Sequence, residues 1–230
     1  MFKQQTIMTI AIISTLIGLV GCGNLSQSTD NTQSVASSSH EVLNYFYGVA
    51  FGSEYGSGSL KVKKWTRPIK LKLLDDVTEE DLHIVSDIIA ELNAITGAQL
   101  NIQLTTNNDY NLGVHIIPQS EFTRYNPNAI HANGWVSLRI SGSSHIKSGT
   151  ILIAKELEGD LRQHVIREEI TQALGILKDS WERDDSIFYQ GYSTLTNYSS
   201  IDIEVIKLLY QSDIQAGMTL NQVQSLLDPS

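Results

Sequence analysis

Three polar side chains capable of chemistry lie close together between Glu168 and Gly175, where the chain reads E-E-I-T-Q-A-L-G. In a helix, residues four positions apart share one face, so Glu168 and Gln172 would point the same way. That spacing lets two side chains hold one metal ion, while the residue after the first can deprotonate a bound water. Glu169 is therefore the candidate general base, and Glu168 and Gln172 are candidate cleft residues.

This segment resembles the zinc-binding helix of metallopeptidases, H-E-x-x-H-x-x-G, with both histidines replaced. Glu168 and Gln172 occupy the two ligand positions. Gly175 matches the glycine that turns the chain in the metzincin class of zincins, where a third ligand follows three residues later. The resemblance implies that Lys178 stands at the third-ligand position, followed by Asp179.

Two blocks further along the chain are also similar to metzincins. Residues 186–189 read S-I-F-Y, where metzincins often carry S-I-M-Y in a turn beneath the metal, so Phe188 replaces the methionine. Metzincins then have a final helix ending in leucine and tyrosine, and this chain has L-L-Y at 208–210. The resemblance implies an α+β fold. It would be a metzincin-like zincin domain with a mixed twisted sheet, a long backing helix, an active-site-type helix and a C-terminal helix.

The chain is also similar to a bacterial family known only as a domain of unknown function. Members of that family carry E-E-x-T-Q-x-L-G followed by S-I-F, together with an upstream F-G-S-E block and a basic-tryptophan strand. The corresponding residues here are 51–54 and Lys64-Trp65. This similarity covers residues 41–218, and it implies a fold without an established activity.

The residue types at the ligand positions argue against a bound metal. Zinc prefers nitrogen and sulfur ligands, and Glu168, Gln172 and Lys178 offer one good oxygen donor. A protonated lysine cannot ligate, and it repels a dication at close range. We therefore expect no metal cofactor, and we expect Lys178 to replace the metal by pairing with Glu168 or Glu169.

A displaced zinc site is the alternative. His164 precedes Glu168 by four residues, so the two share a helix face one turn earlier. With Asp179 they could supply three zinc ligands. If His164 is only an exposed residue near the start of the helix, this alternative has no basis.

The N-terminus predicts export. Lys3 is the only charge in residues 1–21, and residues 7–20 form an apolar run typical of a secretory signal peptide. The run ends in L-V-G-C at 19–22, which resembles the cleavage box of bacterial lipoproteins. The resemblance implies cleavage before Cys22 and lipidation of its thiol and new amino group. An ordinary cleaved signal with a chance cysteine is the alternative.

The residue after the cysteine bears on the location. Position 23 is glycine rather than aspartate, which by analogy with other lipoproteins favours the outer membrane. We expect a lipid-anchored protein of the bacterial cell envelope that faces the periplasm. Cys22 is the only cysteine in the chain, so no intramolecular disulfide can form.

Composition divides the rest of the chain into a tether and a domain. Residues 22–40 carry too few apolar side chains to fold, and we expect a flexible tether after the lipidated cysteine. Residues 41–230 would form the metzincin-like domain, beginning with a helix and a glycine-rich connection over 41–58.

Without residues 1–21 the chain has 15 basic and 25 acidic residues, a net charge of −10. This charge argues against a nucleic-acid partner.

Periodicity predicts the order of elements within the domain. Thr78 would cap a long helix that ends at Gly97. The last helix would begin at about Ser200, with a short one near 219–227. The predicted strands cover 65–74, 99–104, 112–117, 135–140 and 149–154, and the helix carrying Glu168 covers 159–177.

Two functions fit these features. The first is a catalytically silent metzincin relative that binds an extended peptide or an envelope protein. In metzincins, the strand before the last sheet strand forms the upper lip of the cleft, and here that lip would be 135–140. The second is an atypical metallopeptidase-like hydrolase with Glu169 as general base.

Overall fold

The computed structural model describes residues 29–51 and 60–228. The chain divides into two units, residues 1–36 and 37–230, and the described part of the first unit is the start of helix α1 (Thr29–Ala50). The expected signal peptide, the lipidation site at Cys22 and the glycine-rich stretch 52–58 lie outside the described residues.

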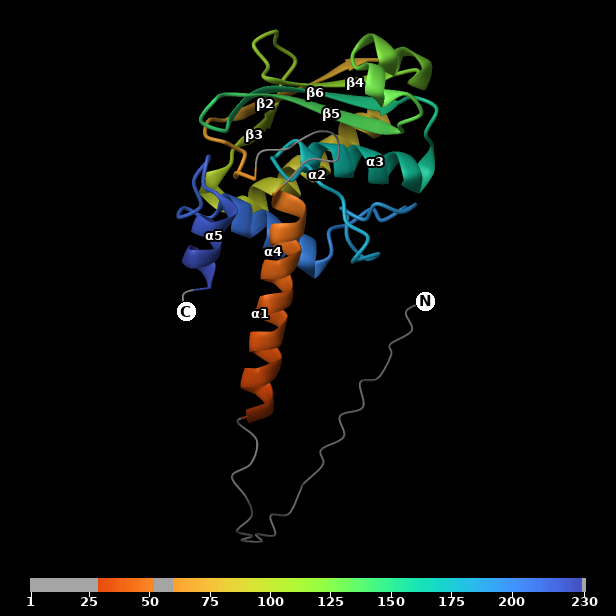
Figure 1. The fold of residues 1–230 in the computed structure, drawn as a ribbon. Helices are drawn as coiled ribbons and strands as arrows, with labels where there is room; N and C mark the ends of the chain where they lie inside the picture. Colours follow the sequence, from red (N-terminus) through yellow and green to blue (C-terminus); the bar gives the residue numbers. More distant parts are fainter. Residues whose placement is uncertain (1–28, 52–59, 229–230) are drawn as a thin grey trace, which may run out of the picture. The chain divides into compact units, whose positions relative to one another are not determined.

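Six described strands form one mixed sheet in the second unit (Figure 1). The strands run in the order β3, β2, β4, β6, β5, and the two-residue strand β1 also pairs with β6. All pairings are parallel except that of β5 with β6. The strands are β1 (Lys64–Trp65), β2 (Ile69–Asp75), β3 (Ile102–Leu104), β4 (Leu112–Ile117), β5 (Gly134–Ile140) and β6 (His145–Ala154).

The helices α2, α3 and α4 all lie on one side of this sheet, and α4 packs on α2 (Figure 1). Their buried side chains form one core with those of the strands and with the end of α1, where Tyr45, Phe46 and Val49 are buried. A smaller apolar cluster on the other side includes Phe122 and Trp135. The helices after α1 are α2 (Glu79–Thr96), α3 (Gly159–Gln172), α4 (Ser200–Tyr210) and α5 (Leu220–Leu227), and the 3₁₀ helices are η1 (Gly97–Gln99), η2 (Gln119–Arg124) and η3 (Pro127–Ala129).

This mixed α/β arrangement is compatible with the predicted α+β class. The predicted bounds of β4 are confirmed, and so are the start of α4 and the cap of α2. Thr78 accepts a hydrogen bond from the Asp81 amide, and Asp81 accepts one from the Thr78 amide, which makes a capping box. The predicted strand 65–74 is instead two strands, because Pro68 has no amide hydrogen for a sheet ladder.

Helix α1 begins earlier than the sequence predicts. A flexible tether is expected as far as residue 40, whereas the helix already begins at Thr29. Once the packed turns around Phe46 are helical, each further residue adds a hydrogen bond without a new nucleation cost. The helix therefore extends past the start of the apolar pattern and into the polar segment that precedes it.

Among the described residues, no helix is both long enough and apolar enough to span a membrane.

Candidate functional site

Helix α3 is fixed to α2 by two arginines. Arg162 donates from Nε and Nη2 to the two carboxylate oxygens of Asp81, at 2.7 and 2.9 Å, and Asp81 is fully buried. One turn later, the Arg167 guanidinium pairs with Glu91 and lies 4.5 Å from the centre of the Tyr198 ring. Both contacts hold the side of α3 that faces α2.

The end of α3 is closed by residues distant in sequence. The Trp65 indole donates to the Ala173 carbonyl at 2.8 Å, and the Tyr210 hydroxyl donates to the Leu174 carbonyl at 2.8 Å. These bonds satisfy carbonyls that a helix end leaves without partners. Gly175 follows with φ of +119°, and a Cβ there would lie 2.0 Å from the Lys63 carbonyl oxygen. The helix therefore stops at Gln172, not at 177 as the sequence predicts.

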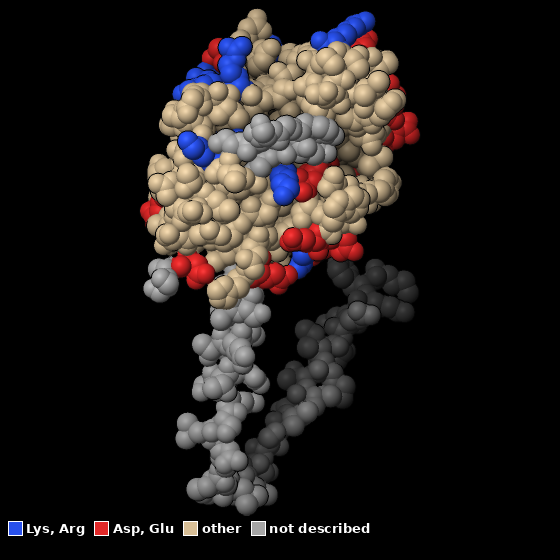
Figure 2. Space-filling view, viewed as in Figure 1, with Lys and Arg blue, Asp and Glu red and all other residues tan. Residues whose placement is uncertain are grey.

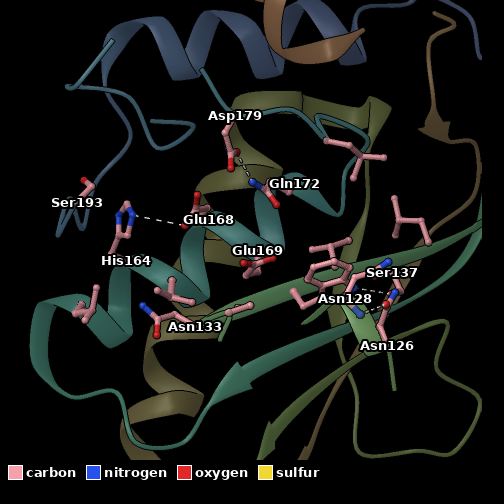
Figure 3. Close-up of a pocket in the computed structure, with 18 of the residues that line it drawn as sticks. Asn126, Asn128, Asn133, Ser137, His164, Glu168, Glu169, Gln172, Asp179 and Ser193 are labelled. Atoms are coloured by element: carbon pink, nitrogen blue, oxygen red, sulfur yellow. Dashed lines mark hydrogen bonds and ion pairs between the residues drawn. The ribbon is translucent and has the colours of Figure 1, made fainter. Parts of the chain in front are cut away.

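A pocket of about 500 Å³ lies between α3 and β5 (Figure 3). It brings together five of the residues singled out from the sequence: His164, Glu168, Glu169, Gln172 and Asp179. The other lining residues come mainly from β5, from the segment before it and from the loop after residue 190. They are Asn126, Asn128, Ala132, Asn133, Gly134, Trp135, Val136, Ser137, Leu138, Ile140, Leu161, Val165, Leu177, Gly191, Tyr192 and Ser193.

His164 and Glu168 are neighbours on the pocket side of α3, as predicted from their spacing. His164 is 3% exposed, and its Nδ1 lies 2.9 Å from the Leu195 carbonyl oxygen. Its Nε2 lies 3.6 Å from Glu168 Oε2 (Figure 3). Burial lowers the pKa of His164, which favours the neutral imidazole.

Gln172 and Asp179 form a second polar pair in the pocket. The Gln172 amide nitrogen donates to Asp179 Oδ1 at 2.6 Å (Figure 3). Glu169 lies on the β5 side of the helix and is 7% exposed. A Cβ at Gly134 would lie 2.2 Å from Glu169 Oε1, so the glycine is what allows this carboxylate to lie against the strand.

Two of the predicted cleft residues are not in the pocket. Lys178 is exposed and is not among the lining residues, so it does not fill a site between Glu168 and Glu169 as expected. Its neighbours Leu177 and Asp179 both line the pocket, so the chain after Gly175 runs past the pocket while the Lys178 side chain remains exposed. Phe188 is fully buried in the main core and packs there as a structural residue.

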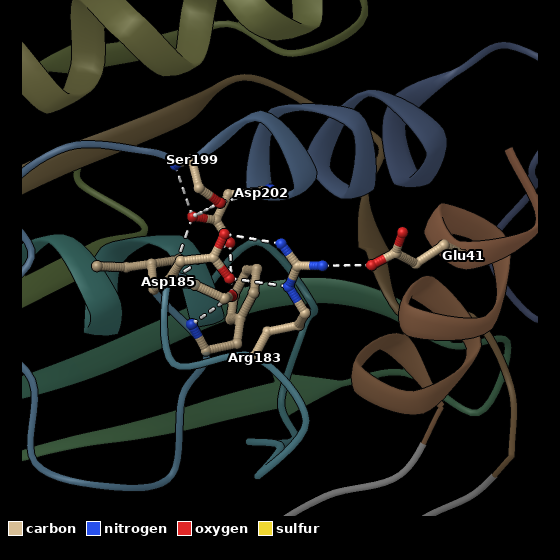
Figure 4. Close-up of polar contacts among 8 residues, drawn as sticks. Glu41, Arg183, Asp185, Ser199 and Asp202 are labelled. Atoms are coloured by element: carbon tan, nitrogen blue, oxygen red, sulfur yellow. Dashed lines mark hydrogen bonds and ion pairs between the residues drawn. The ribbon is translucent and has the colours of Figure 1, made fainter. Parts of the chain in front are cut away.

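The turn that carries Phe188 is held by a buried carboxylate (Figure 4). Asp202 accepts hydrogen bonds from the Ser186 hydroxyl at 2.6 Å and from the Ile187 amide at 3.1 Å. Burial raises the pKa of Asp202. Beside it, Arg183 pairs with Asp185 and with Glu41 of α1 (Figure 4). The turn is therefore tied both to α4 and to α1.

The donor set does not fit a three-ligand zinc site. His164 and Glu168 give two donors, and the third predicted ligand, Asp179, is bonded to Gln172. Across the described residues, no three His, Cys, Asp or Glu side chains are grouped to hold a metal ion. Structural and catalytic zinc sites need at least three protein ligands.

Sequence reasoning missed most of the polar residues that lie opposite α3. Asn126, Asn128 and Asn133 line the pocket from the segment before β5, and Tyr192 and Ser193 line it from beyond residue 190. Three asparagines within eight residues were the available signal. That signal was ambiguous, because asparagine is also frequent in turns. The Asn126 side chain does serve a turn here, since it accepts from the Asn128 amide at 2.9 Å.

Residues 39–229 match the family described as Protein of unknown function (DUF2927). The chain belongs to the DUF2927 family. This match confirms the expected membership of an uncharacterised family, and it names no activity for the DUF2927 domain. No curated protein matches the chain.

Proposed function

We propose that this DUF2927 domain is a non-catalytic binding module that takes up an extended peptide along β5. The observation that carries the proposal is the lining of the pocket: residues 134–138 of β5 all contribute to it. Successive residues of a strand point to opposite faces, so a pocket lined by five in a row runs along the edge of the strand. An edge is where an added strand binds.

The register of the sheet identifies the backbone groups that would bind the peptide. The Ala154 amide donates to the Asn133 carbonyl. Within the strands, Trp135 of β5 lies opposite Leu152 of β6. Backbone groups in an antiparallel pair alternate between the two edges, so those of Trp135 and Ser137 face β6. The groups of Gly134, Val136 and Leu138 then face the outer edge, beside α3.

The resemblance to metzincins supports the same position. It places the upper lip of the cleft at the strand before the last sheet strand, and β5 precedes β6. Strand addition uses backbone hydrogen bonds and requires no metal. A metzincin-like ancestor that lost its metal ligands could thus have kept peptide binding while losing peptide hydrolysis.

The proposal includes a location. A signal peptide over 1–21 and lipidation of Cys22 would anchor the domain in the bacterial cell envelope, at the outer membrane and facing the periplasm. The partner would then be a peptide or a segment of an envelope protein. Mass spectrometry of the purified full-length protein tests this step, because an unmodified Cys22 would contradict it.

Backbone amide NMR of the protein with capped heptapeptides tests the binding function. The probes are acetylated and amidated T-V-S-X-S-V-T, with X as norleucine, lysine, arginine or glutamate, since β5 itself has seven residues. We expect the amides of Gly134, Val136 and Leu138 to shift together with at least one probe. If no probe binds more tightly than about 1 mM, the proposed function is wrong.

A proline substitution sharpens the test. Val136→Pro removes one outward amide, and an edge strand tolerates proline where the amide is not used in the ladder. We expect Val136→Pro to weaken binding at least ten-fold, whereas Val136→Ala keeps the amide and most of the affinity. Equal affinities of the two variants would rule out strand addition.

A hydrolase remains the second candidate because Glu169 lines the pocket and lies against Gly134 of β5. A carboxylate in that place could act as a general base on a water beside a bound peptide. The heptapeptides, incubated with the protein and with Glu169→Gln, distinguish the two functions. Cleavage by the parent protein and not by the variant would replace the binding function with hydrolysis.

A further inference from the structure

We infer that α1 controls one wall of the pocket through the loop 180–190, so that seating of α1 on this loop regulates binding. The inference adds a control element outside the binding site, and it rests on the proposed function only in naming a peptide as the guest. Two observations carry it. The loop is closed at its neck by backbone hydrogen bonds, and its body is bonded to α1.

The neck of the loop is formed by Ser180, Phe188 and Gln190. The Ser180 amide donates to the Phe188 carbonyl at 2.9 Å, and the Gln190 amide donates to the Ser180 carbonyl at 3.1 Å. The residues that leave the neck on its two sides are Asp179 and 191–193, and all of them line the pocket. A movement of the loop as one body therefore moves this wall of the pocket.

An arginine joins the body of the loop to α1. Arg183 pairs with Glu41 of α1 and with Asp185 of the loop (Figure 4). The hydrogen bonds from Arg183 lower the pKa of Asp185, so this carboxylate stays ionised beside it. Both partners of the arginine are thus acidic, and they belong to different elements.

The surroundings of this arginine are acidic. Four of the residues 179–185 are Asp or Glu, and Arg183 is the one basic residue among them. Figure 2 shows that most charged atoms along the lower margin of the domain are acidic. Since like charges repel, α1 and the loop depend on the arginine to stay together at Glu41.

The seat of α1 is packed at one end and hollow at the other. Tyr45 and Phe46 are buried in the core, whereas Glu41, one turn earlier, is exposed. A cavity of about 440 Å³ lies between these turns of α1 and the loop, where Glu182 and Arg183 line it. Separating a hollow contact loses fewer dispersion contacts than separating a close-packed one. The turn that carries Glu41 can therefore leave the loop while the buried turn keeps its place.

The coupling between α1 and the pocket is reciprocal. If unseating of α1 lets the neck open, a guest that holds the wall in place favours the seated helix by the same factor. The sequence before α1 carries the proposed lipidation site, Cys22. A pull on that segment, or its contact with a membrane, would then act on the pocket from outside the binding site.

Native-state hydrogen exchange of the Ser180 and Gln190 amides, followed by NMR, tests the inference without a guest. Glu41→Lys turns an attraction to Arg183 into a repulsion, and we expect both amides to exchange about three- to five-fold faster. Glu121→Lys makes the same change beside Arg124, in an exposed pair of η2, and should leave both amides unchanged. Equal exchange at the neck in these two variants would overturn the inference.

A truncation within the seat should have a larger effect. Tyr45→Ala removes a buried ring that α1 packs against the domain, and we expect at least ten-fold faster exchange at the neck. Ile102→Ala truncates a buried side chain of β3, at the other edge of the sheet, and is the control for a general loss of stability. Because loop amides exchange by local opening, Ile102→Ala should not accelerate them.

The two truncations also define a contrary result. Equal acceleration at the neck by Tyr45→Ala and Ile102→Ala would overturn the inference, since lost stability would then account for both. If Tyr45→Ala does not fold, Glu41→Lys decides, because it changes an exposed side chain.

Titration with the norleucine heptapeptide separates this inference from the proposed function. We expect the probe to slow exchange at the neck and to bind about three-fold more weakly to Glu41→Lys than to Glu121→Lys. If no heptapeptide binds, the proposed function is wrong, and the exchange measurements still decide whether α1 controls the wall. Equal affinities for the two variants, with the amides of β5 shifted in both, would keep strand addition and overturn regulation by α1.

Discussion

Helix α3 places charge differently on its two sides. Towards α2, Arg162 and Arg167 each have a carboxylate partner from that helix, and the contact of Arg162 with Asp81 is almost fully buried. Towards the pocket, Glu168 and Glu169 stand beside an imidazole and an amide. The first side joins two elements of the domain, whereas the second presents acceptors to a cavity. The same helix thus separates a structural task from the proposed binding task.

The largest effect is expected where the structural side loses its buried cation. Arg162→Met leaves Asp81 buried without its guanidinium, which should lower the free energy of unfolding by about 3–5 kcal/mol. Urea denaturation measures this loss. Arg124→Met, in an exposed pair with Glu121, is the matched control and should change stability by less than about 1 kcal/mol. Equal losses in the two variants would contradict the comparison.

Arg167→Met should have a smaller effect than Arg162→Met. Its partner Glu91 is 42% exposed, so water can solvate that carboxylate once the arginine is gone. The contact with Tyr198 is lost as well, and together these changes should lower the free energy of unfolding by about 2 kcal/mol. A loss equal to that of Arg162→Met, by the same denaturation measurement, would show that exposure of the partner does not matter.

Acid should weaken the structural side of α3. Burial alone would raise the pKa of Asp81, but the hydrogen bonds from Arg162 and Thr78 hold it below its ordinary value. Its contribution to stability is therefore complete above the unfolded pKa, about 4, and is lost as the pH falls through the folded pKa. One proton changes stability by at most about 1.4 kcal/mol per pH unit.

The Asp81→Asn variant isolates this contribution. Below about pH 4 its stability should fall less steeply with decreasing pH than that of the parent protein, measured by denaturation at each pH. Parallel curves for the two proteins would assign the acid sensitivity to other groups. Asp202 has the opposite sign, because its raised pKa makes stability fall as the pH rises from its unfolded pKa to its folded one.

The smallest effect is expected on the pocket side. Glu168→Gln keeps the shape of the side chain and reduces repulsion between neighbouring carboxylates, so stability should change by less than about 1 kcal/mol. Thermal unfolding of the variant and of Glu204→Gln checks this. A loss as large as that of Arg167→Met would make Glu168 a structural residue and would remove the contrast between the two sides.

The sequence predicted elements best where local rules and tertiary contacts agree. The strand 112–117, the helix capped by Thr78 and the start of the helix at Ser200 have bounds that local signals specify. The members of the pocket that share α3 were also predictable, because helical spacing alone brings His164, Glu168 and Gln172 to one face. Spacing along a helix is a strong constraint even without knowledge of what the helix packs against.

The errors arose where a contact distant in sequence decides the geometry. The end of α3 at Gln172 depends on Gly175 meeting the Lys63 carbonyl, a contact across more than a hundred residues. Glu169 lines the pocket as expected, but its close approach to β5, which depends on Gly134, had no local signal. The partner of Arg162 is 81 residues away, and nothing in the local pattern names it.

The closing of the α3 end has a consequence for the timing of folding during synthesis. Trp65 leaves the ribosome long before Ala173, and Tyr210 emerges 36 residues after the carbonyl that it binds. Until α4 is available, the end of α3 lacks one of its two donors, and the Trp65 amide lacks its contact with the Tyr210 hydroxyl. A growing chain of this protein thus cannot close the end of α3 until α4 has been synthesised.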